Sequence, residues 1–132
     1  MTDDDVAEAG IERIDLSGVV LDCANARELA DFYLALLGWE LCTDDPEDSW
    51  LAIKPAEGGV QISFQREDNY RPPTWPTTLE EQQMMIHLDF HPADLERAHV
   101  HAVAVGAVPT PWQPQPHIRV YTDPAGHLFC FA

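Results

Sequence analysis

Residues 25–38 read Asn-Ala-Arg-Glu-Leu-Ala-Asp-Phe-Tyr-Leu-Ala-Leu-Leu-Gly, and this stretch decides how the rest of the chain is interpreted. Its apolar side chains recur at helical spacing, which predicts an amphipathic helix with one buried face. Asn25 is a favourable N-cap, Glu28 completes a capping box, and Gly38 ends the pattern. An alternating segment precedes the helix at 17–22. Three more follow near 39–43, 49–54 and 59–65, so the order of elements is strand, helix, strand, strand, strand.

The second half of the chain repeats this order of signals. Asp94 stands 69 positions after Asn25, and Pro124-Ala125 stands 69 positions after Pro55-Ala56. Residues 84–90 predict a strand, Asp94 begins a helix that Gly106 ends, and strands follow near 107–110, 117–122 and 127–131. This period is longer than those of solenoid repeats, so two facing copies fit better than a stack. We expect an α+β fold of two tandem βαβββ modules, with curved mixed sheets around a cleft and the helices outside.

A proline-rich segment separates the two copies. Residues 70–76 read Tyr-Arg-Pro-Pro-Thr-Trp-Pro, and prolines at this density cannot pair within a sheet. The expected organisation is an acidic N-terminal segment at 1–15 and a single domain at 16–132. Within that domain, module one covers 16–65, the connector 66–83 and module two 84–132.

Composition excludes several classes of protein. The chain of 132 residues carries seven Lys+Arg against 23 Asp+Glu, a net charge of −16 that repels nucleic-acid phosphates and anionic membranes. No apolar run approaches the ~20 residues that span a bilayer, and the acidic start does not resemble a signal peptide. The three cysteines form no close pair, which favours reduced thiols in a cytoplasmic protein.

Strand alternation divides the predicted sheets into two faces. One face is apolar throughout and is expected to lie under the helices. Its members are Val19, Leu21, Leu51, Ile53, Val60, Ile62, Phe64, Ile86, Leu88, Phe90, Val120, Phe129 and Phe131.

The opposite face is mixed in polarity, as the wall of a ligand cavity is, although a solvated outer face has the same pattern. The candidate ligand-binding residues are Trp50, Gln61, Ser63, His87, Asp89, Arg119, Tyr121 and Cys130. A carboxylate in a partly dry cavity needs a partner, so we expect Asp89 to hydrogen-bond Arg119, Tyr121 or His87. The alternative is that Asp89 caps a turn or contacts water.

Three stretches together resemble the vicinal oxygen chelate superfamily, which includes glyoxalase I, bleomycin-resistance proteins and extradiol dioxygenases. They are the helix that ends in Leu36-Leu37-Gly38-Trp39, the strand Met85-Ile86-His87-Leu88-Asp89, and the turn Asp123-Pro124-Ala125-Gly126-His127. The connector is similar to that of bacterial glyoxalase-like domain proteins. The resemblance covers about residues 16–132. It implies paired βαβββ modules, a metal or ligand site between them, and a homodimer.

The family's metal ligands lie on the first and fourth strands of each module, which implies Gly18, Gln61, His87 and Cys130 here. Glycine has no ligating side chain, glutamine is a weak neutral ligand, and only His87 is a strong one. We therefore expect no metal cofactor, with a divalent metal at His87 and Gln61 as the alternative.

The function expected from these residues is binding of a small organic molecule without a complete metal site. The first alternative is a lyase, isomerase or dioxygenase that uses metal, or that uses His87 and Asp89 as acid and base. These two residues are the only catalytic candidates. The second alternative is a domain that serves assembly alone.

Overall fold

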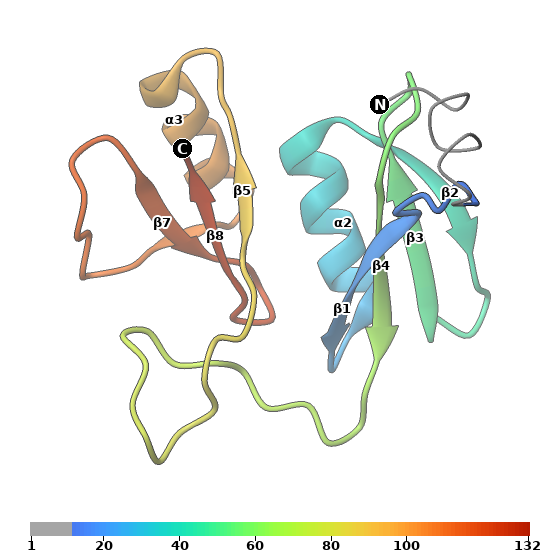
Figure 1. Cartoon of the computed structure of the whole chain (residues 1–132), viewed down its shortest axis with the longest axis horizontal. Coiled ribbons are helices and arrows are strands. Elements are labelled where there is room, and N and C mark those ends of the chain that lie inside the picture. Colours follow the sequence, from blue (N-terminus) through green and yellow to red (C-terminus); the bar gives the residue numbers. More distant parts are fainter. Residues whose placement is uncertain (1–11) are drawn as a thin grey trace.

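The computed structural model describes residues 12–132 and contains two four-stranded mixed sheets, each with one helix (Figure 1). Module one contains β1 (Gly18–Cys23), α2 (Ala26–Leu37), β2 (Glu40–Asp44), β3 (Trp50–Lys54) and β4 (Gln61–Arg66). Module two contains β5 (Leu88–Phe90), α3 (Leu95–Ala104), β6 (Val108–Pro109), β7 (Arg119–Thr122) and β8 (Leu128–Phe131). The strand orders are β1-β4-β3-β2 and β5-β8-β7-β6, and the first pair in each order is parallel. The predicted α+β class and its repeated βαβββ order are confirmed.

Segments without regular structure lie between and before the modules. Residues 67–87 contain no helix or strand and run along one end of both modules (Figure 1). Residues 12–17 are also irregular, and residues 1–11 of the expected acidic segment lie outside the described residues. In the described part of the chain, no helix is long and apolar enough to cross a membrane.

The helix ends follow the capping signals in the sequence. The Asn25 side chain accepts a hydrogen bond from the Glu28 amide at 3.0 Å, and Gly38 adopts a left-handed φ of 68°. In module two, the Asp94 side chain accepts from the Arg97 amide at 3.1 Å. The helix α3 closes on Val105, one residue before the predicted terminator Gly106.

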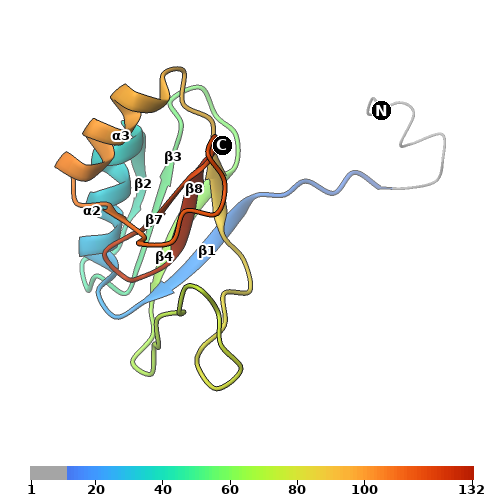
Figure 2. The same ribbon diagram turned by 90° about the vertical axis from the view of Figure 1, so that its left-hand side faces the viewer.

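One hydrophobic core joins the two modules. Both helices lie on the same side of the two sheets (Figure 2). The Tyr33 ring of α2 stacks on Phe64 of its own sheet at 5.7 Å and meets Phe129 of the other sheet edge-on at 6.1 Å. The Tyr33 hydroxyl also donates to Asp123 at 2.8 Å, between β7 and β8. Through these contacts α2 packs on both sheets.

Most of the predicted apolar face belongs to this core, with three exceptions. Val60 and Ile86 are exposed, and Val120 packs in a separate cluster on the opposite side of its sheet. The predicted strand at 84–90 is also shorter than expected, since only residues 88–90 pair. Its partner β8 begins at Leu128, directly after the turn at 123–127, so residues 84–87 find no strand beside them.

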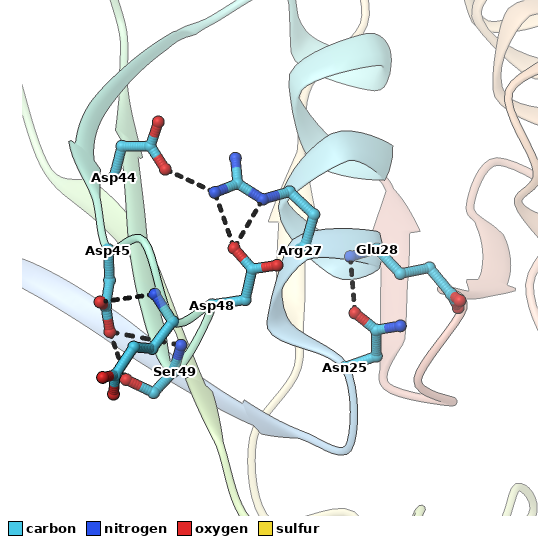
Figure 3. A network of polar contacts seen from close by, with 8 residues as sticks. Asn25, Arg27, Glu28, Asp44, Asp45, Asp48 and Ser49 are labelled. Carbon is cyan, nitrogen blue, oxygen red and sulfur yellow. Dashed lines mark hydrogen bonds and ion pairs between the residues drawn. The ribbon is translucent and has the colours of Figure 1, made fainter.

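An arginine ties the β2–β3 hairpin to the start of α2 (Figure 3). The Arg27 guanidinium donates to Asp44 at 2.5 Å and to Asp48 at 2.8 and 3.1 Å. Asp45 accepts hydrogen bonds from the Glu47 amide and from Ser49 within the same turn. This network holds the outer hairpin of module one in place without burying a charge.

Candidate functional site

A pocket of about 130 Å³ lies on the face of module two that points away from the helices. The strands β7 and β8 supply its floor, and the connector and the loop before β7 supply its walls. Its lining is largely apolar, with polar groups from His87, Gln115 and Cys130. The full set of lining residues is Trp75, Met84, His87, Pro114, Gln115, Ile118, Val120, Leu128 and Cys130.

A cluster of three different polar side chains adjoins this pocket. His87 Nε2 lies 3.1 Å from Asp89 Oδ1, and Asp89 pairs with Cys130 across the parallel strands β5 and β8. One potential ligand atom from each of the three lies within 4.8 Å of the other two. The side chains of His87 and Asp89 are 39% and 60% exposed, whereas Cys130 is buried. Burial, reinforced by the nearby Asp89 carboxylate, raises the pKa of the Cys130 thiol to about 11.

Trp75 brings an unsatisfied donor to the same place. Its indole Nε1 is buried and has no hydrogen-bond partner within residues 12–132. The ring packs on the cluster of Val120, Leu128 and Cys130 and lies 5.2 Å from the ring of Trp112. Buried indole N–H groups are nearly always paired, so a water molecule or a ligand atom is an expected partner of this one.

Two of the predicted ligand-binding residues lie on the wrong face for this role. Tyr121 pairs with Phe129 and Arg119 with Phe131, so both side chains point toward the helices. Tyr121 Oη lies 2.7 Å from His99 Nδ1, and Arg119 donates to Glu96 at 2.6 Å. The sequence analysis placed Val120 under the helices and therefore assigned Arg119 and Tyr121 to the opposite face. Either Val120 or Tyr121 can be buried in a core, and only the strand register shows which of them faces the helices. Of the three partners predicted for Asp89, the structure provides His87.

The module-one candidates are not part of the pocket. Trp50, Gln61 and Ser63 lie on the sheet of module one, where Gln61 Nε2 donates to Ser63 Oγ at 3.4 Å. The Cys42 thiol approaches Gln61 Oε1 at 3.7 Å. The eight predicted residues therefore separate into two on the helix side, three in module one, and the trio of His87, Asp89 and Cys130.

Two of the four positions implied for a family metal carry no ligating side chain in the observed register. Gly18 pairs with Gln61, and a Cβ at Gly18 would lie 2.8 Å from Gln61 Cγ, so no side chain has room there. Leu88 pairs with Phe129, which places His87 level with Leu128 instead of Cys130. The spacing between the two copies is therefore 67 positions in the last strand instead of 69. The residue that corresponds to Gln61 is then Leu128 instead of Cys130.

Sequence reasoning missed the pocket residues that come from irregular segments. Trp75 and Met84 belong to the residues before β5, and Pro114 and Gln115 belong to the loop before β7. Strand alternation carries no information about such segments. The available signal was the placement of Trp75 and Trp112 among prolines, which marks rigid loops that hold large apolar rings.

A wider hollow of about 390 Å³ lies on the helix side of the molecule. It is lined by the end of α2, the start of α3 and the segment between β5 and α3, and it is more open than the pocket of module two. One ring nitrogen of each of its two histidines contacts a backbone carbonyl: His101 Nε2 lies 3.0 Å from that of Ala35, and His91 Nδ1 lies 2.9 Å from that of Ala132. We regard it as the groove between the two helices.

Solved structures share this fold at low sequence identity. A glyoxalase/bleomycin resistance protein/dioxygenase family enzyme from Burkholderia phytofirmans matches with a TM-score of 0.69 and 15% identity, over 89% of this chain and 97% of its own. The fosfomycin resistance protein FosX from Listeria monocytogenes, with Mn(II) and 1S,2S-dihydroxypropylphosphonic acid, gives 0.66 and 15%, over 90% and 89%. The antibiotic binding protein TnmS3 from a Streptomyces species gives 0.56 and 15%, over 90% and 97%.

The comparison with sequences is more specific about the family. No curated protein sequence matches the chain. The family model described as glyoxalase-like domain matches residues 18–132, which span every helix and strand described above. The chain therefore belongs to the glyoxalase-like domain family.

Proposed function

We propose that this protein binds a small organic molecule in the pocket of module two. The observation that carries the proposal is the largely apolar pocket walled by Trp75, whose buried indole N–H has no partner among the described residues. An orphaned buried donor costs about 1–3 kcal/mol, which an acceptor atom of a ligand would recover.

The pocket limits the kind of ligand. Its volume of about 130 Å³ is smaller than the roughly 300–1,000 Å³ of ordinary ligand pockets, so it fits a compact molecule or one end of a larger one. Apolar side chains line most of it, and His87, Gln115 and Cys130 bring polar groups to its lining. A compact apolar or aromatic group with an acceptor oxygen or nitrogen meets these conditions. Two of the similar structures, the phosphonate complex of FosX and the antibiotic binding protein TnmS3, also concern small ligands.

Ligand-observed NMR with a fragment library tests this proposal. Fragments that carry an acceptor are expected to bind the wild type, and Trp75→Phe is expected to weaken them about tenfold, as loss of one hydrogen bond does. Trp50→Phe is the matched control, because Trp50 lies on the sheet of module one. Equal binding by the wild type and Trp75→Phe would contradict the proposal.

An acid–base enzyme is the second candidate, and the contact between His87 and Asp89 favours it. A carboxylate 3.1 Å from a histidine Nε2 orients the ring, as general acid–base catalysis requires. If a turnover is found, His87→Ala is expected to abolish it and Asp89→Asn to reduce it. Unchanged rates in both variants would remove this candidate.

A homodimer and a cytoplasmic location complete the proposal. The dimer is supported by apolar side chains left exposed beside the sheet edges, among them Val20, Met85 and Ile86. The location is supported by three free cysteines in a chain of this size. Light scattering at micromolar concentration should give twice the chain mass of 14.8 kDa, and a monomer would reject the dimer.

A further inference from the structure

We propose that the hollow between the two helices binds a small carboxylic acid with an apolar body. The hollow lies on the helix side of the sheets, opposite the pocket of module two, so this second site goes beyond the proposed function and does not depend on it (Figure 2). Its volume of about 390 Å³ falls within the roughly 300–1,000 Å³ of ordinary ligand pockets, which the pocket of module two does not reach.

The floor of the hollow is apolar and belongs to the margin of the hydrophobic core. Leu36 at the end of α2 and Phe131 of β8 both line the hollow and are buried. Phe90 and Ala98 line it as half-buried neighbours of the same core. An apolar ligand body placed here would remove the remaining exposed surface of these side chains from water, which favours binding.

The hollow is open because the inner face of α3 is built from smaller side chains than that of α2. The spacing of 69 positions that relates the two helix caps makes Ala98 and Ala102 the counterparts of Leu29 and Tyr33. Six residues of α2 are buried, whereas Ala102 is the single buried residue of α3. Module one therefore fills this space with its own helix, and module two leaves it to another molecule.

The rim of the hollow carries a cation that has no ion-pair partner in the described part of the chain. Within residues 12–132, no carboxylate lies within ion-pair distance of Arg97, although four other arginines form such pairs. Asp94, the acidic residue of the rim, accepts a hydrogen bond from the backbone amide of Arg97 at 3.1 Å. The guanidinium is thus available, and its planar fork matches a carboxylate group.

Two histidines bring further donors to the same rim. His101 Nε2 and His91 Nδ1 each contact a backbone carbonyl, so these two nitrogens carry ring protons. The second nitrogen of each ring makes no hydrogen bond within residues 12–132. A carboxylate bound beside the rings favours their cationic forms, in which the second nitrogens also donate.

The charges favour a monoanion over a dianion. The rim has one permanent cation, and the chain as a whole carries a net charge of −16. A dianionic phosphate therefore meets stronger repulsion from the protein than a carboxylate does. The apolar floor and the cationic rim together describe an amphipathic acid, for which octanoate is a suitable probe.

Titration of the full chain with octanoate, followed by amide-resolved NMR spectra, tests the site. We expect saturable shifts of amide signals around the hollow, such as those of Leu37, His91 and Ala98. Octyl phosphate and octylamine carry the same apolar chain and should bind there at least about tenfold more weakly. Equal or tighter binding of octyl phosphate would overturn the choice of a carboxylate, and equal binding of octylamine would overturn the role of the cationic rim.

Two variants separate the charge of the rim from the space above the floor. Arg97→Gln should weaken octanoate binding at least about tenfold, as loss of a charged hydrogen bond does. Arg71→Gln is its control, because it removes an exposed cation from the connector. Ala98→Leu restores the residue type of Leu29 and should block the hollow, whereas Ala104→Leu makes the same change at an exposed position of α3 outside it.

Three further outcomes would overturn the proposal. Unchanged affinity in both Arg97→Gln and Ala98→Leu would show that octanoate does not use the hollow. Shifts confined to Trp75, Val120 and Leu128 would place octanoate in the pocket of module two and support the proposed function instead. Shifts around the hollow when the protein is diluted without octanoate would show that a second copy of the chain covers it. Absence of octanoate binding would also reject this site, while the pocket of module two and its own test stay unaffected.

Discussion

The two modules share one backbone plan and differ in what their open faces hold. In module one, the Gln61 side chain lies against Gly18, and Ala52 and Ser63 are buried. The side chains of this sheet therefore fill the space that a pocket would need. In module two, the corresponding region keeps a pocket, because residues 67–87 fold over it and bring Trp75 and Met84 to its wall. Repetition of a fold therefore preserves strand order while the site depends on side chains and on the segment that covers one copy.

Two aspartates in different hairpins, one in the β2–β3 turn and one in the β7–β8 turn, show a second difference between the modules. Asp45 in module one and Asp123 in module two both accept hydrogen bonds from backbone amides of their turns. Asp45 faces solvent, whereas the Asp123 side chain is fully buried and also contacts Tyr33 and His127. Asp45 therefore caps a turn at the surface, whereas Asp123 is the polar centre of the junction between the modules.

Asp123→Ala should produce the largest loss of stability. It leaves buried partners of the carboxylate unsatisfied, among them the Tyr33 hydroxyl and the amides of Ala125 and His127, which predicts a loss of about 3–5 kcal/mol in the free energy of unfolding. Urea denaturation measures it. Asp45→Ala is the control and should have a much smaller effect, and equal losses would show that burial at the junction does not matter.

Tyr33→Phe tests the link between the modules and its dependence on pH. The lost hydrogen bond to Asp123 should cost about 1–3 kcal/mol near neutral pH. Burial, and secondly the charge of Asp123, raise the pKa of Tyr33 well above its ordinary value of about 10. The folded state therefore keeps the phenol protonated, and its contribution is present below about pH 10 and lost as pH rises toward the folded pKa.

The measurement is urea denaturation at about pH 8 and about pH 10.5. Wild-type stability should fall more between these values than that of Tyr33→Phe. Tyr70→Phe is the control for loss of a phenol, since the Tyr70 hydroxyl donates to the Ala125 carbonyl at 2.8 Å at a less buried position. A pH dependence identical in the wild type and Tyr33→Phe would contradict the assignment.

Gly18→Ala tests whether module one is closed to a side chain. The new Cβ would lie 2.8 Å from Gln61 Cγ and 3.0 Å from the Gln61 carbonyl oxygen, so a loss of about 1–3 kcal/mol is expected. Gln61→Ala in the same chain should recover part of it, while the backbone contact remains. Val20→Ala, two positions along the same strand at an exposed site, is the control. Thermal unfolding equal to the wild type in Gly18→Ala would show that the site has room for a ligating residue.

The fold was predictable because its signals are local. Capping at Asn25 and Asp94, the left-handed Gly38 and the apolar stripe of α2 all act within a few residues. The site was less predictable because it depends on register. A spacing of 69 positions relates the helix caps of the two modules. In β8 the spacing to the corresponding residues of β4 is two positions shorter. Strand alternation alone cannot detect a change of two residues, because it leaves every side chain on the same face.

Two further properties of the site were beyond local reasoning. Tyr121 and Arg119 have amphipathic side chains that satisfy either face of a strand, and only pairing with Phe129 and Phe131 assigns them to the helix side. Trp75 reaches the pocket through a connector whose path depends on tertiary packing. His87 and Asp89 could be predicted to share a face, because they are two positions apart in extended backbone at the start of β5.

The smallest effect is expected from Arg27→Ala, which removes the ion pairs between α2 and the β2–β3 hairpin. Hydrogen bonds to Asp44 and Asp48, in that order, raise the pKa of Arg27, so the guanidinium stays charged. Both partner carboxylates are about half exposed, and water and salt screen such pairs strongly. We expect a small drop in melting temperature at low salt that disappears as ionic strength rises above roughly 0.5 M.

Arg66→Ala, which affects an exposed pair with Asp68 at 3.7 Å, is the control and should change nothing at either ionic strength. A large drop that persists in high salt would show that this hairpin depends on a rigid contact, and module one would then have a polar anchor comparable to Asp123 in module two.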